Sequence, residues 1–348
     1  MKKYSLFLLA AILFISCGGS SKKGETVKIS GAGATFPAPF YNIVFKEYAE
    51  ASGNDVTYGG IGSGGGIRSL KDKTVDFGAT DVFLSDREME EMGADVIHIP
   101  TALGAVVLSY NLKGVTDLKL TAELISAIYR GEITHWNDAK IKALNPDIEF
   151  PDKGITPVYR SDGSGTTAVF SEYMSKVNES WKNTIGEGKS LQFPAGVAAK
   201  GNPGVAGIVA ETEGAIGYIG SEYALALNIP SAWLQNSSGH FVKADSKSIS
   251  ASANVDIPDD TRVVITNSPH PDAYPISTFT WIIAYKEQQY NKHTEAEARA
   301  LVDLFHYITG ANGQQIATKT YYAPLSATAL EKTKAVIASI TFGGKSER

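Results

Sequence analysis

The chain has 348 residues, of which 43% are hydrophobic, and a formal net charge of −5. This length exceeds that of one typical core, so we expect two domains. An acidic chain lacks the basic surface that nucleic-acid binding requires, so we expect no nucleic-acid partner. The charge does not exclude a small anion, because local fields can hold one.

The N-terminus has the pattern of a secretory signal. Lys2 and Lys3 precede an apolar run, 6–15, that is too short to span a bilayer. Cys17, the only cysteine, follows this run, and the stretch 13–17 (LFISC) resembles a bacterial lipobox in which Phe14 replaces the usual leucine. We predict a signal peptide at 1–16, lipidation of Cys17 and a flexible tether at 17–27.

An ordinary signal with a buried cysteine nearby is the alternative at this end of the chain. Removal of residues 1–16 takes away Lys2 and Lys3 and changes the net charge from −5 to −7. The remaining chain is therefore still acidic.

Strand-like runs alternate with helical patterns along the rest of the chain, which predicts an α/β fold. A helix is expected to follow Pro37 and to end near Gly53, because Phe40, Val44 and Tyr48 recur on one face. The other predicted helices begin after Gly66 and after Thr167 and lie at about 294–309 and 328–339; loops and short elements are expected at 232–262. The predicted strands are 27–30, 56–58, 74–79, 105–110, 156–160 and 279–285.

Three turns share one design, in which a strand is followed by small residues and then by a helix. They are 31–36 (GAGATF), 59–66 (GGIGSGGG) and 162–167 (DGSGTT). The first four N–H groups of a helix have no partner within the helix, and the helix dipole adds about half a positive charge there. Glycine lets an oxyanion approach the backbone, and serine and threonine add hydroxyl donors. If the three turns converge with Arg160, their positive character sums to about 2.5 charges, enough for a doubly charged oxyanion.

The second turn also fits a different function. The spacing of a dinucleotide-binding turn is present at Gly60, Gly62 and Gly65. Asp76 or Asp81 follows at about the sequence distance expected for the acidic residue that binds the ribose of the dinucleotide. The secretory start and the two other anion-type turns argue against this alternative, because nicotinamide enzymes are normally kept inside the cell with their cofactor.

A secreted hydrolase that acts on phosphate esters is another alternative. Ser164 lies in Asp-Gly-Ser-Gly, which is not the Gly-x-Ser-x-Gly of a nucleophile elbow. The six histidines are scattered without the spacing of metal ligands. We therefore expect no enzymatic activity, no cofactor and no metal.

Four motifs together resemble the phosphate-binding protein of bacterial ABC-type phosphate importers. They are 31–39 (GAGATFPAP), 60–65 (GIGSGG), 75–81 (VDFGATD) and 160–166 (RSDGSGT), and the similarity covers nearly the whole mature chain. The resemblance implies a type II periplasmic-binding-protein fold with two α/β lobes, a hinge that the chain crosses twice and a central ligand cleft. Lobe 1 would comprise 28–104 and 272–348, and lobe 2 would comprise 105–271.

The same resemblance implies a function and a set of ligand contacts. The protein would bind inorganic phosphate outside the cytoplasmic membrane, remain anchored through Cys17 and deliver the ion to the membrane permease subunits of the importer. We expect a monomer. Carried over motif by motif, the phosphate contacts fall on Ala34, Thr35, Phe36, Ser63, Asp81, Arg160, Asp162, Ser164, Gly165 and Thr166.

Asp81 is unexpected beside an anion. Phosphate near neutral pH carries at least one hydrogen that it can donate to a carboxylate, whereas sulfate carries none. A site built on such a hydrogen bond rejects the wrong ion by about 10⁴-fold or more. The alternative is that Asp81 caps a helix beginning near Ser85.

Arg160 and Asp162 are two residues apart at a strand end, so their side chains can point the same way. We predict that Asp162 orients the guanidinium while Arg160 donates twice to one edge of the phosphate. A surface ion pair of little energetic value is the alternative.

Overall fold

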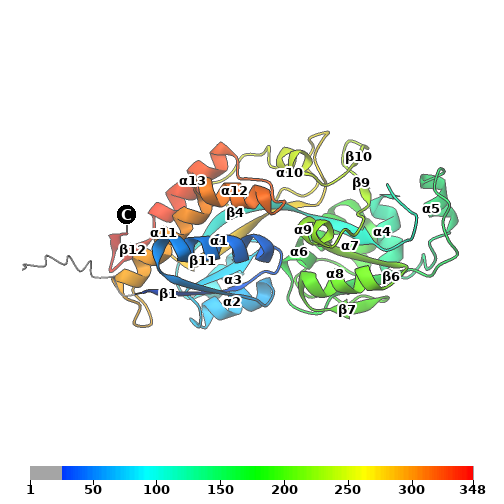
Figure 1. Ribbon diagram of the computed structural model, residues 1–348. Helices are drawn as coiled ribbons and strands as arrows, with labels where there is room; N and C mark the ends of the chain where they lie inside the picture. The colour runs from blue at the N-terminus through cyan, green and yellow to red at the C-terminus, as the bar shows by residue number, and fades with distance from the viewer. Residues whose placement is uncertain (1–25, 348) are drawn as a thin grey trace, which may run out of the picture.

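The computed structural model describes residues 26–347. The predicted signal peptide, Cys17 and all but the last two residues of the predicted tether lie outside the described residues. Figure 1 shows two α/β lobes that lie side by side and are joined by strands running between them. Within residues 26–347, no helix is both long and apolar enough to cross a membrane.

One eight-stranded sheet runs through both lobes in the order β2-β1-β3-β11-β4-β8-β6-β7. Lobe 1 contains β1, β2, β3 and β11, and lobe 2 contains β6, β7 and β8. Within each lobe the strands β1–β3 and β6–β8 pair in parallel, whereas β11 runs antiparallel to β3 and β4. The bounds are β1 (Lys28–Gly33), β2 (Asp55–Gly60), β3 (Phe77–Thr80), β4 (Val96–Tyr110), β6 (Thr156–Arg160), β7 (Val197–Ala199), β8 (Ala215–Gly220) and β11 (Ser277–Tyr285).

Short strands lie outside this sheet. β5 (Lys119–Leu120), β9 (Trp233–Gln235) and β10 (Phe241–Val242) form a three-stranded sheet, and β12 (Thr341–Phe342) pairs with β13 (Lys345–Ser346) near the C-terminus. The predicted loops and short elements of 232–262 are therefore confirmed.

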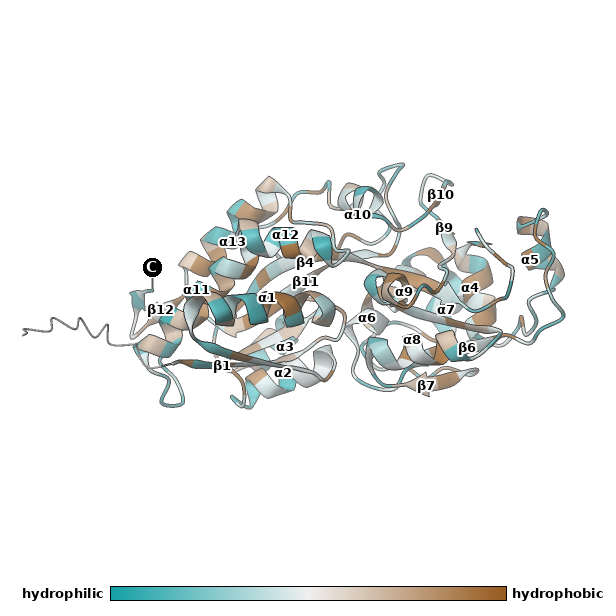
Figure 2. Cartoon of the chain, viewed as in Figure 1, coloured by the Kyte–Doolittle hydropathy of each residue, from teal (hydrophilic) through white to brown (hydrophobic). Residues whose placement is uncertain are grey.

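Helices cover the sheet in both lobes, and in Figure 2 helices such as α1 and α13 carry both hydrophilic and hydrophobic residues. Lobe 1 has α1 (Ala38–Ser52), α2 (Ser63–Lys71), α3 (Asp86–Glu91), α11 (Glu295–Thr309), α12 (Ala311–Lys319) and α13 (Ala327–Ala338). Lobe 2 has α4 (Ala122–Tyr129), α5 (Ala139–Leu144), α6 (Gly165–Val177), α7 (Glu179–Thr184), α8 (Gly201–Glu211) and α9 (Ser221–Ala226), and α10 (Ser246–Ser252) lies in the segment that returns to β11. The prediction for α1 is confirmed: the helix follows Pro37, buries Phe40, Val44 and Tyr48, and ends at the left-handed Gly53.

Two segments connect the lobes, and β4 is one of them. Its first part, up to Ala105, pairs with β11, and its last part, from Val106, pairs with β8. The second segment leads into β11 beside the first, because Val106 N donates to Ile276 O. The chain therefore passes between the lobes at two adjacent points of the sheet.

Glu222 is a buried carboxyl group beside this junction. It lies in the first turn of α9, is 2% exposed, and neither carboxyl oxygen has a hydrogen-bond partner among the described residues. Gly220, which pairs with Val106 of β4, lies against it, and a Cβ on Gly220 would come within 2.0 Å of Glu222 Oε1. Burial raises the pKa of the Glu222 carboxyl to about 8, and the nearby Asp81 acts in the same direction.

A neutral side chain at position 222 should stabilise the protein at alkaline pH. In the unfolded chain this carboxyl ionises near its ordinary pKa of 4.5, whereas in the folded protein it keeps its proton up to about pH 8. Between these values the folded state binds more protons, so the free energy of unfolding falls as the pH rises. We expect Glu222→Gln to melt within about 1 °C of the parent protein at pH 5 and at least about 3 °C higher at pH 8, by scanning calorimetry.

Glu211→Gln is the matched control, because Glu211 is exposed at the end of α8 in the same lobe. Its melting temperature should differ from that of the parent by the same small amount at every pH. A difference for Glu222→Gln that does not change between pH 5 and pH 8 would show that the buried carboxyl is already ionised at neutral pH.

Candidate functional site

Turns from both lobes meet at the lobe interface. Because the strands on each side are parallel, their carboxyl ends lie on one edge of each half of the sheet, where ligands of open α/β folds bind. Thr35 follows β1, Ser63 begins α2, Asp81 follows β3 and Arg160 ends β6. All four side chains are buried, as are Ser164 and Thr166 at the start of α6.

Ser63 connects the second and third predicted turns. Its Oγ accepts from Gly165 N of lobe 2 at 3.1 Å and from Asp81 N of lobe 1 at 3.4 Å, and it donates to Asp81 Oδ2 at 3.5 Å. A second contact lies beside it, because Gly64 N donates to Gly163 O at 2.9 Å. The starts of α2 and α6 therefore face each other across the interface.

Two glycines make this close approach possible. Gly62, the N-cap of α2, has φ 86°, and a Cβ there would lie 2.3 Å from Asp162 Oδ2. A Cβ on Gly165 would lie 2.3 Å from Ser63 Oγ and 2.6 Å from Asp81 Oδ2. A larger residue at either position would push the lobes apart or displace a predicted contact.

Asp81 lies at the centre of the group and is 1% exposed. Thr280 Oγ1 of β11 donates to Asp81 Oδ1 at 3.0 Å, and Thr278 Oγ1 donates to the Asp81 carbonyl at 3.0 Å. Burial raises the pKa of the Asp81 carboxyl to about 7, although the hydrogen bond from Thr280 and the charge of Arg160 lower it. The alternative role as a helix cap is wrong, because Ser85 caps α3 through a capping box with Glu88.

Arg160 and Asp162 form a two-point ion pair. Arg160 Nε donates to Asp162 Oδ1 at 2.7 Å, and Arg160 Nη2 donates to Asp162 Oδ2 at 2.5 Å. The two side chains are 1% and 12% exposed, so the alternative of a surface pair is wrong. Although burial acts in the opposite direction, the hydrogen bonds from Arg160 and from Gly201 N hold the pKa of the Asp162 carboxyl below its ordinary value.

Ala34, Phe36 and Ser164 complete the predicted set. Tyr58 donates its hydroxyl hydrogen to Ala34 O at 2.6 Å, and Tyr322 donates to Phe36 O at 2.5 Å, so the first turn is held on both sides. Ser164 is the N-cap of α6, and its Oγ accepts from Thr167 N at 3.0 Å. The structure therefore brings eight of the ten predicted positions together at the lobe interface, and Ala34 and Phe36 flank one of them, Thr35, on the lobe 1 side.

Asn202, Thr280 and Tyr223 also contact these residues and were not among the predicted contacts. Asn202 Nδ2 donates to Thr35 Oγ1 and to Thr166 Oγ1, each at 3.0 Å, and Tyr223 of α9 donates to Thr35 O at 2.5 Å. The only signal for Asn202 is the weak resemblance of the stretch 200–202 (KGN) to the same phosphate-binding proteins. Thr280 lies in a buried strand whose pattern is explained by packing alone, so its role could not be predicted from the sequence.

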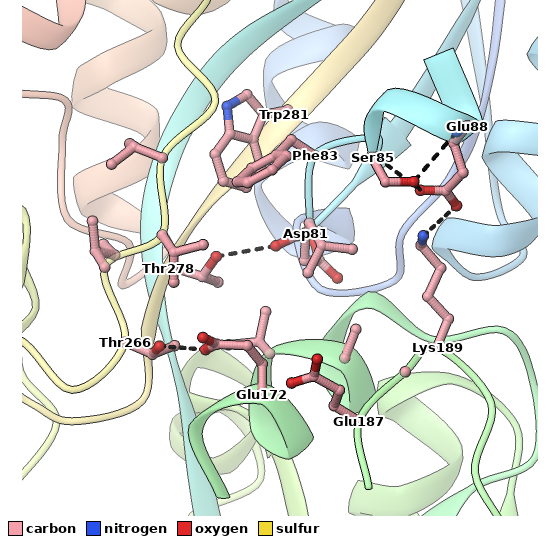
Figure 3. A pocket seen from close by; sticks show the side chains of 17 residues that line it. Asp81, Phe83, Ser85, Glu88, Glu172, Glu187, Lys189, Thr266, Thr278 and Trp281 are labelled. Atoms are coloured by element: carbon pink, nitrogen blue, oxygen red, sulfur yellow. Dashed lines mark hydrogen bonds and ion pairs between the residues drawn. The ribbon is translucent and has the colours of Figure 1, made fainter. Parts of the chain in front are cut away.

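A cavity of about 390 Å³ opens between the lobes beside Asp81. Figure 3 shows Phe83 and Trp281 on its lobe 1 side and Glu172 and Glu187 on its lobe 2 side. Lys189 Nζ reaches across the interface to Glu88 Oε1 at 2.6 Å. Although burial opposes it, this lysine helps to hold the pKa of the Glu88 carboxyl below its ordinary value.

The chemistry of the site is that of directed hydrogen bonding. Arg160, the threonine hydroxyls and the starts of α2 and α6 supply donors, and Asp81 supplies a buried acceptor. Such an enclosure suits a small oxyanion that carries a hydrogen. Within residues 26–347, no cluster of three histidine, cysteine, aspartate or glutamate side chains is arranged to hold a metal ion.

Comparisons with known proteins agree on one family. A family model described as a PBP superfamily domain matches residues 20–309. The chain is 40% identical over 325 residues to the phosphate-binding protein PstS of Xylella fastidiosa, covering 92% of this chain and 87% of that protein. It is 36% identical over 341 residues to the phosphate-binding protein PstS of Haemophilus influenzae, covering 96% and 97%.

A solved structure supports the fold. The high-affinity periplasmic phosphate-binding protein PfluDING, solved with phosphate, superposes with a TM-score of 0.70 at 21% identity, covering 89% of this chain and 93% of that one. The type II periplasmic-binding fold expected from the sequence is therefore confirmed. The chain belongs to the PBP superfamily and, within it, to the family of phosphate-binding proteins PstS.

Proposed function

We propose that this protein binds inorganic phosphate at the lobe interface, outside the cytoplasmic membrane, and delivers it to the permease of an ABC-type importer. The observation that carries the proposal is the meeting of hydrogen-bond donors from both lobes around one buried carboxyl group, Asp81. Membership in a family of phosphate-binding proteins supports the choice of ligand.

The ligand contacts in this proposal are the ten predicted positions. Arg160, fixed by Asp162, gives two donors to one edge of the ion, and the N–H groups at the starts of α2 and α6 add further donors. The hydroxyl groups of Thr35, Ser63, Ser164 and Thr166 surround the ion, and Ala34, Phe36 and Gly165 contribute backbone. Asp81 accepts the hydrogen that phosphate carries.

Binding is coupled to hinge closure in this proposal. The hydrogen bonds from Tyr223 to Thr35, from Gly165 to Ser63 and from Lys189 to Glu88 all join one lobe to the other. They can form only when the lobes are together, so closure and capture of the ion are one event. We propose that the hinge divides the chain into lobe 1 at 28–104 and 272–348 and lobe 2 at 105–271, as expected from the sequence.

The remaining parts of the proposal concern location and chemistry. A signal peptide at 1–16 directs the chain across the membrane, and lipidation of Cys17 anchors it there through the tether at 17–27. One chain supplies both halves of the site, so a monomer suffices. The protein performs no covalent chemistry on phosphate, because its task is to bind the ion and release it to the permease.

Removal of the Arg160 guanidinium should abolish tight phosphate binding. Arg160→Ala deletes the two donors to one edge of the ion and leaves Asp162 uncompensated beside it. We expect the dissociation constant from titration calorimetry to rise at least about 100-fold, because hydrogen bonds to charged groups contribute about 1.5–3 kcal/mol each. Arg160→Lys, which keeps the charge but loses the planar fork, should lose about 10-fold.

Arg130→Ala is the control for this experiment. Arg130 also lies in lobe 2 and pairs with a carboxylate, Glu132, but away from the interface. Its loss should leave the dissociation constant unchanged. Equal phosphate affinity of Arg160→Ala and the parent protein would remove Arg160 from the site, and absence of phosphate binding by the parent protein would overturn the proposed function.

The preference for phosphate over sulfate should depend on the protonation of Asp81. Above its pKa of about 7, the carboxylate accepts the hydrogen of phosphate and faces a bare oxygen of sulfate. Below that pH, the protonated carboxyl can itself donate to sulfate. The protonated fraction of Asp81 rises about 10-fold from pH 8 to pH 6, so the preference should be about 10-fold smaller at pH 6.

Asp81→Asn tests this assignment, because the amide can donate at every pH. In the variant the preference should be lower than in the parent at pH 8 and should not change with pH. Competition titrations of the two ions at pH 6, 7 and 8 measure it. A variant that retains the full preference of the parent protein would show that Asp81 does not discriminate between the ions.

A further inference from the structure

Asn202, the second residue of α8, makes hydrogen bonds with every polar atom of its side chain. The residue is fully buried. Its Oδ1 accepts from Gly220 N at 2.9 Å, and its Nδ2 donates to Thr35 Oγ1 and to Thr166 Oγ1 at 3.0 Å each. Its main-chain N also donates to Thr35 Oγ1 at 3.0 Å. The bond from Gly220 fixes the orientation of the amide, so the NH₂ group must face the two threonines.

This arrangement determines what the two threonine hydroxyls can do. An NH₂ group only donates, so both hydroxyl oxygens act as acceptors toward Asn202. Thr35 Oγ1 accepts twice from Asn202, and Thr166 Oγ1 accepts from Asn202 and from Arg160 Nη1 at 3.4 Å. A hydroxyl has two lone pairs and one hydrogen. With both lone pairs occupied, each hydroxyl can make one further hydrogen bond, and in it the hydroxyl must be the donor.

We propose that Asn202 is a positioning residue that holds the hydroxyl groups of Thr35 and Thr166 as donors toward the bound anion. The inference rests on the proposed function, in which both threonines contact phosphate. Thr35 belongs to lobe 1 and Thr166 to lobe 2, so one amide sets donors on both sides of the interface. Asn202 can do so only when the lobes are closed, which couples the direction of the donors to closure.

The surroundings explain why such a device is needed. A threonine hydroxyl rotates freely, and the same interface holds two other acceptors, the buried carboxyl group of Asp81 and the partly buried carboxylate of Asp162. Such acceptors compete with an anion for the hydroxyl hydrogen. The N-terminus of α8 adds to the arrangement, because Gly201 N donates to Asp162 Oδ1 and Asn202 N donates to Thr35. A site whose donors are already oriented loses less free energy to rearrangement when the ion binds.

Asn202→Leu tests the inference, because leucine has a similar shape and cannot donate. We expect its dissociation constant for inorganic phosphate, from titration calorimetry at pH 8, to be about 30-fold higher than that of the parent protein. If Asn202 acts through the threonines, the same substitution in a Thr35→Val, Thr166→Val background should cost less than about 5-fold. An equal cost in both backgrounds would overturn the inference, since a merely structural role would not depend on those hydroxyls.

Asn202→Asp is a second variant that keeps the bond from Gly220 N and serves if the leucine variant does not fold. Its carboxylate would accept the hydrogens of both hydroxyls and turn them away from the ion, so we expect a loss of at least about 100-fold at pH 8. The loss relative to the parent protein should shrink as the pH falls and the new carboxyl gains a proton. A loss that stays constant with pH would contradict the assignment.

Asn145→Leu is the matched control. Asn145 is also a buried asparagine of lobe 2 that accepts from one main-chain N–H and donates to main-chain carbonyls, those of Lys119 and Ile141. Its loss should lower the melting temperature and leave phosphate affinity within about twofold. A parent protein that does not bind phosphate would refute the proposed function. This inference alone would be refuted if the parent protein binds phosphate, Arg160→Ala does not, and Asn202→Leu binds it as tightly as the parent.

Discussion

The close approach of two backbone turns across the lobe interface is the constraint on which the site depends. Gly64 N donates to Gly163 O, and Gly165 N donates to Ser63 Oγ, so backbone atoms of each turn bond directly to the other turn. A Cβ on Gly62 or Gly165 would collide with atoms of the opposite lobe at 2.3 Å. The glycines of these turns therefore let two helix starts from different lobes enclose the same small volume.

Three carboxyl groups, of which Asp81 and Glu222 are buried and Asp162 is partly buried, lie in or beside this volume, and their surroundings separate their pKa values. Asp162 shares two hydrogen bonds with Arg160, so its pKa lies below the ordinary value in spite of burial. Burial raises the pKa of Asp81 to about 7 and that of Glu222 to about 8. Among the described residues, no cation is hydrogen-bonded to either carboxyl group to offset this effect. Of these three groups, Asp162 therefore stays ionised near neutral pH, whereas Asp81 and Glu222 are close to their proton equilibrium. This arrangement keeps the local field less negative than the composition suggests.

The local design of the site could be predicted from the sequence, whereas its long-range contacts could not. The turns 31–36, 59–66 and 162–167 stand out because strand, small residues and helix follow one another within a few positions.

The first part of β4 was missed because Pro100 and Gly104 interrupt its pattern. The structure accommodates Pro100 where the pairing with β11 shifts register between Thr280 and Trp281. Helix α12 was missed because Asn312 and Gly313 weaken its pattern. Asn202 and Thr280 reach the site across 167 and 199 residues, to Thr35 and Asp81. A local sequence pattern cannot predict contacts between residues so far apart in the chain, because the order of the strands in the sheet determines them.

In the proposed function, the division of donors between the lobes links ligand affinity to lobe closure. The charge of Arg160 is balanced by Asp162, so the sequence-based sum of about 2.5 positive charges is too large, and the remaining positive character comes from the helix starts. In the proposed function, lobe 1 supplies Thr35, Ser63 and the start of α2, and lobe 2 supplies Arg160, Thr166 and the start of α6. An ion on one lobe alone would meet about half of the donors and would remain partly hydrated. The ion therefore binds the closed form more tightly than the open form, and this difference in binding free energy shifts the equilibrium toward the closed form. Any feature that orients a donor only in the closed form, as the Asn202 amide does for Thr35, increases that difference without changing the contacts made by either lobe alone.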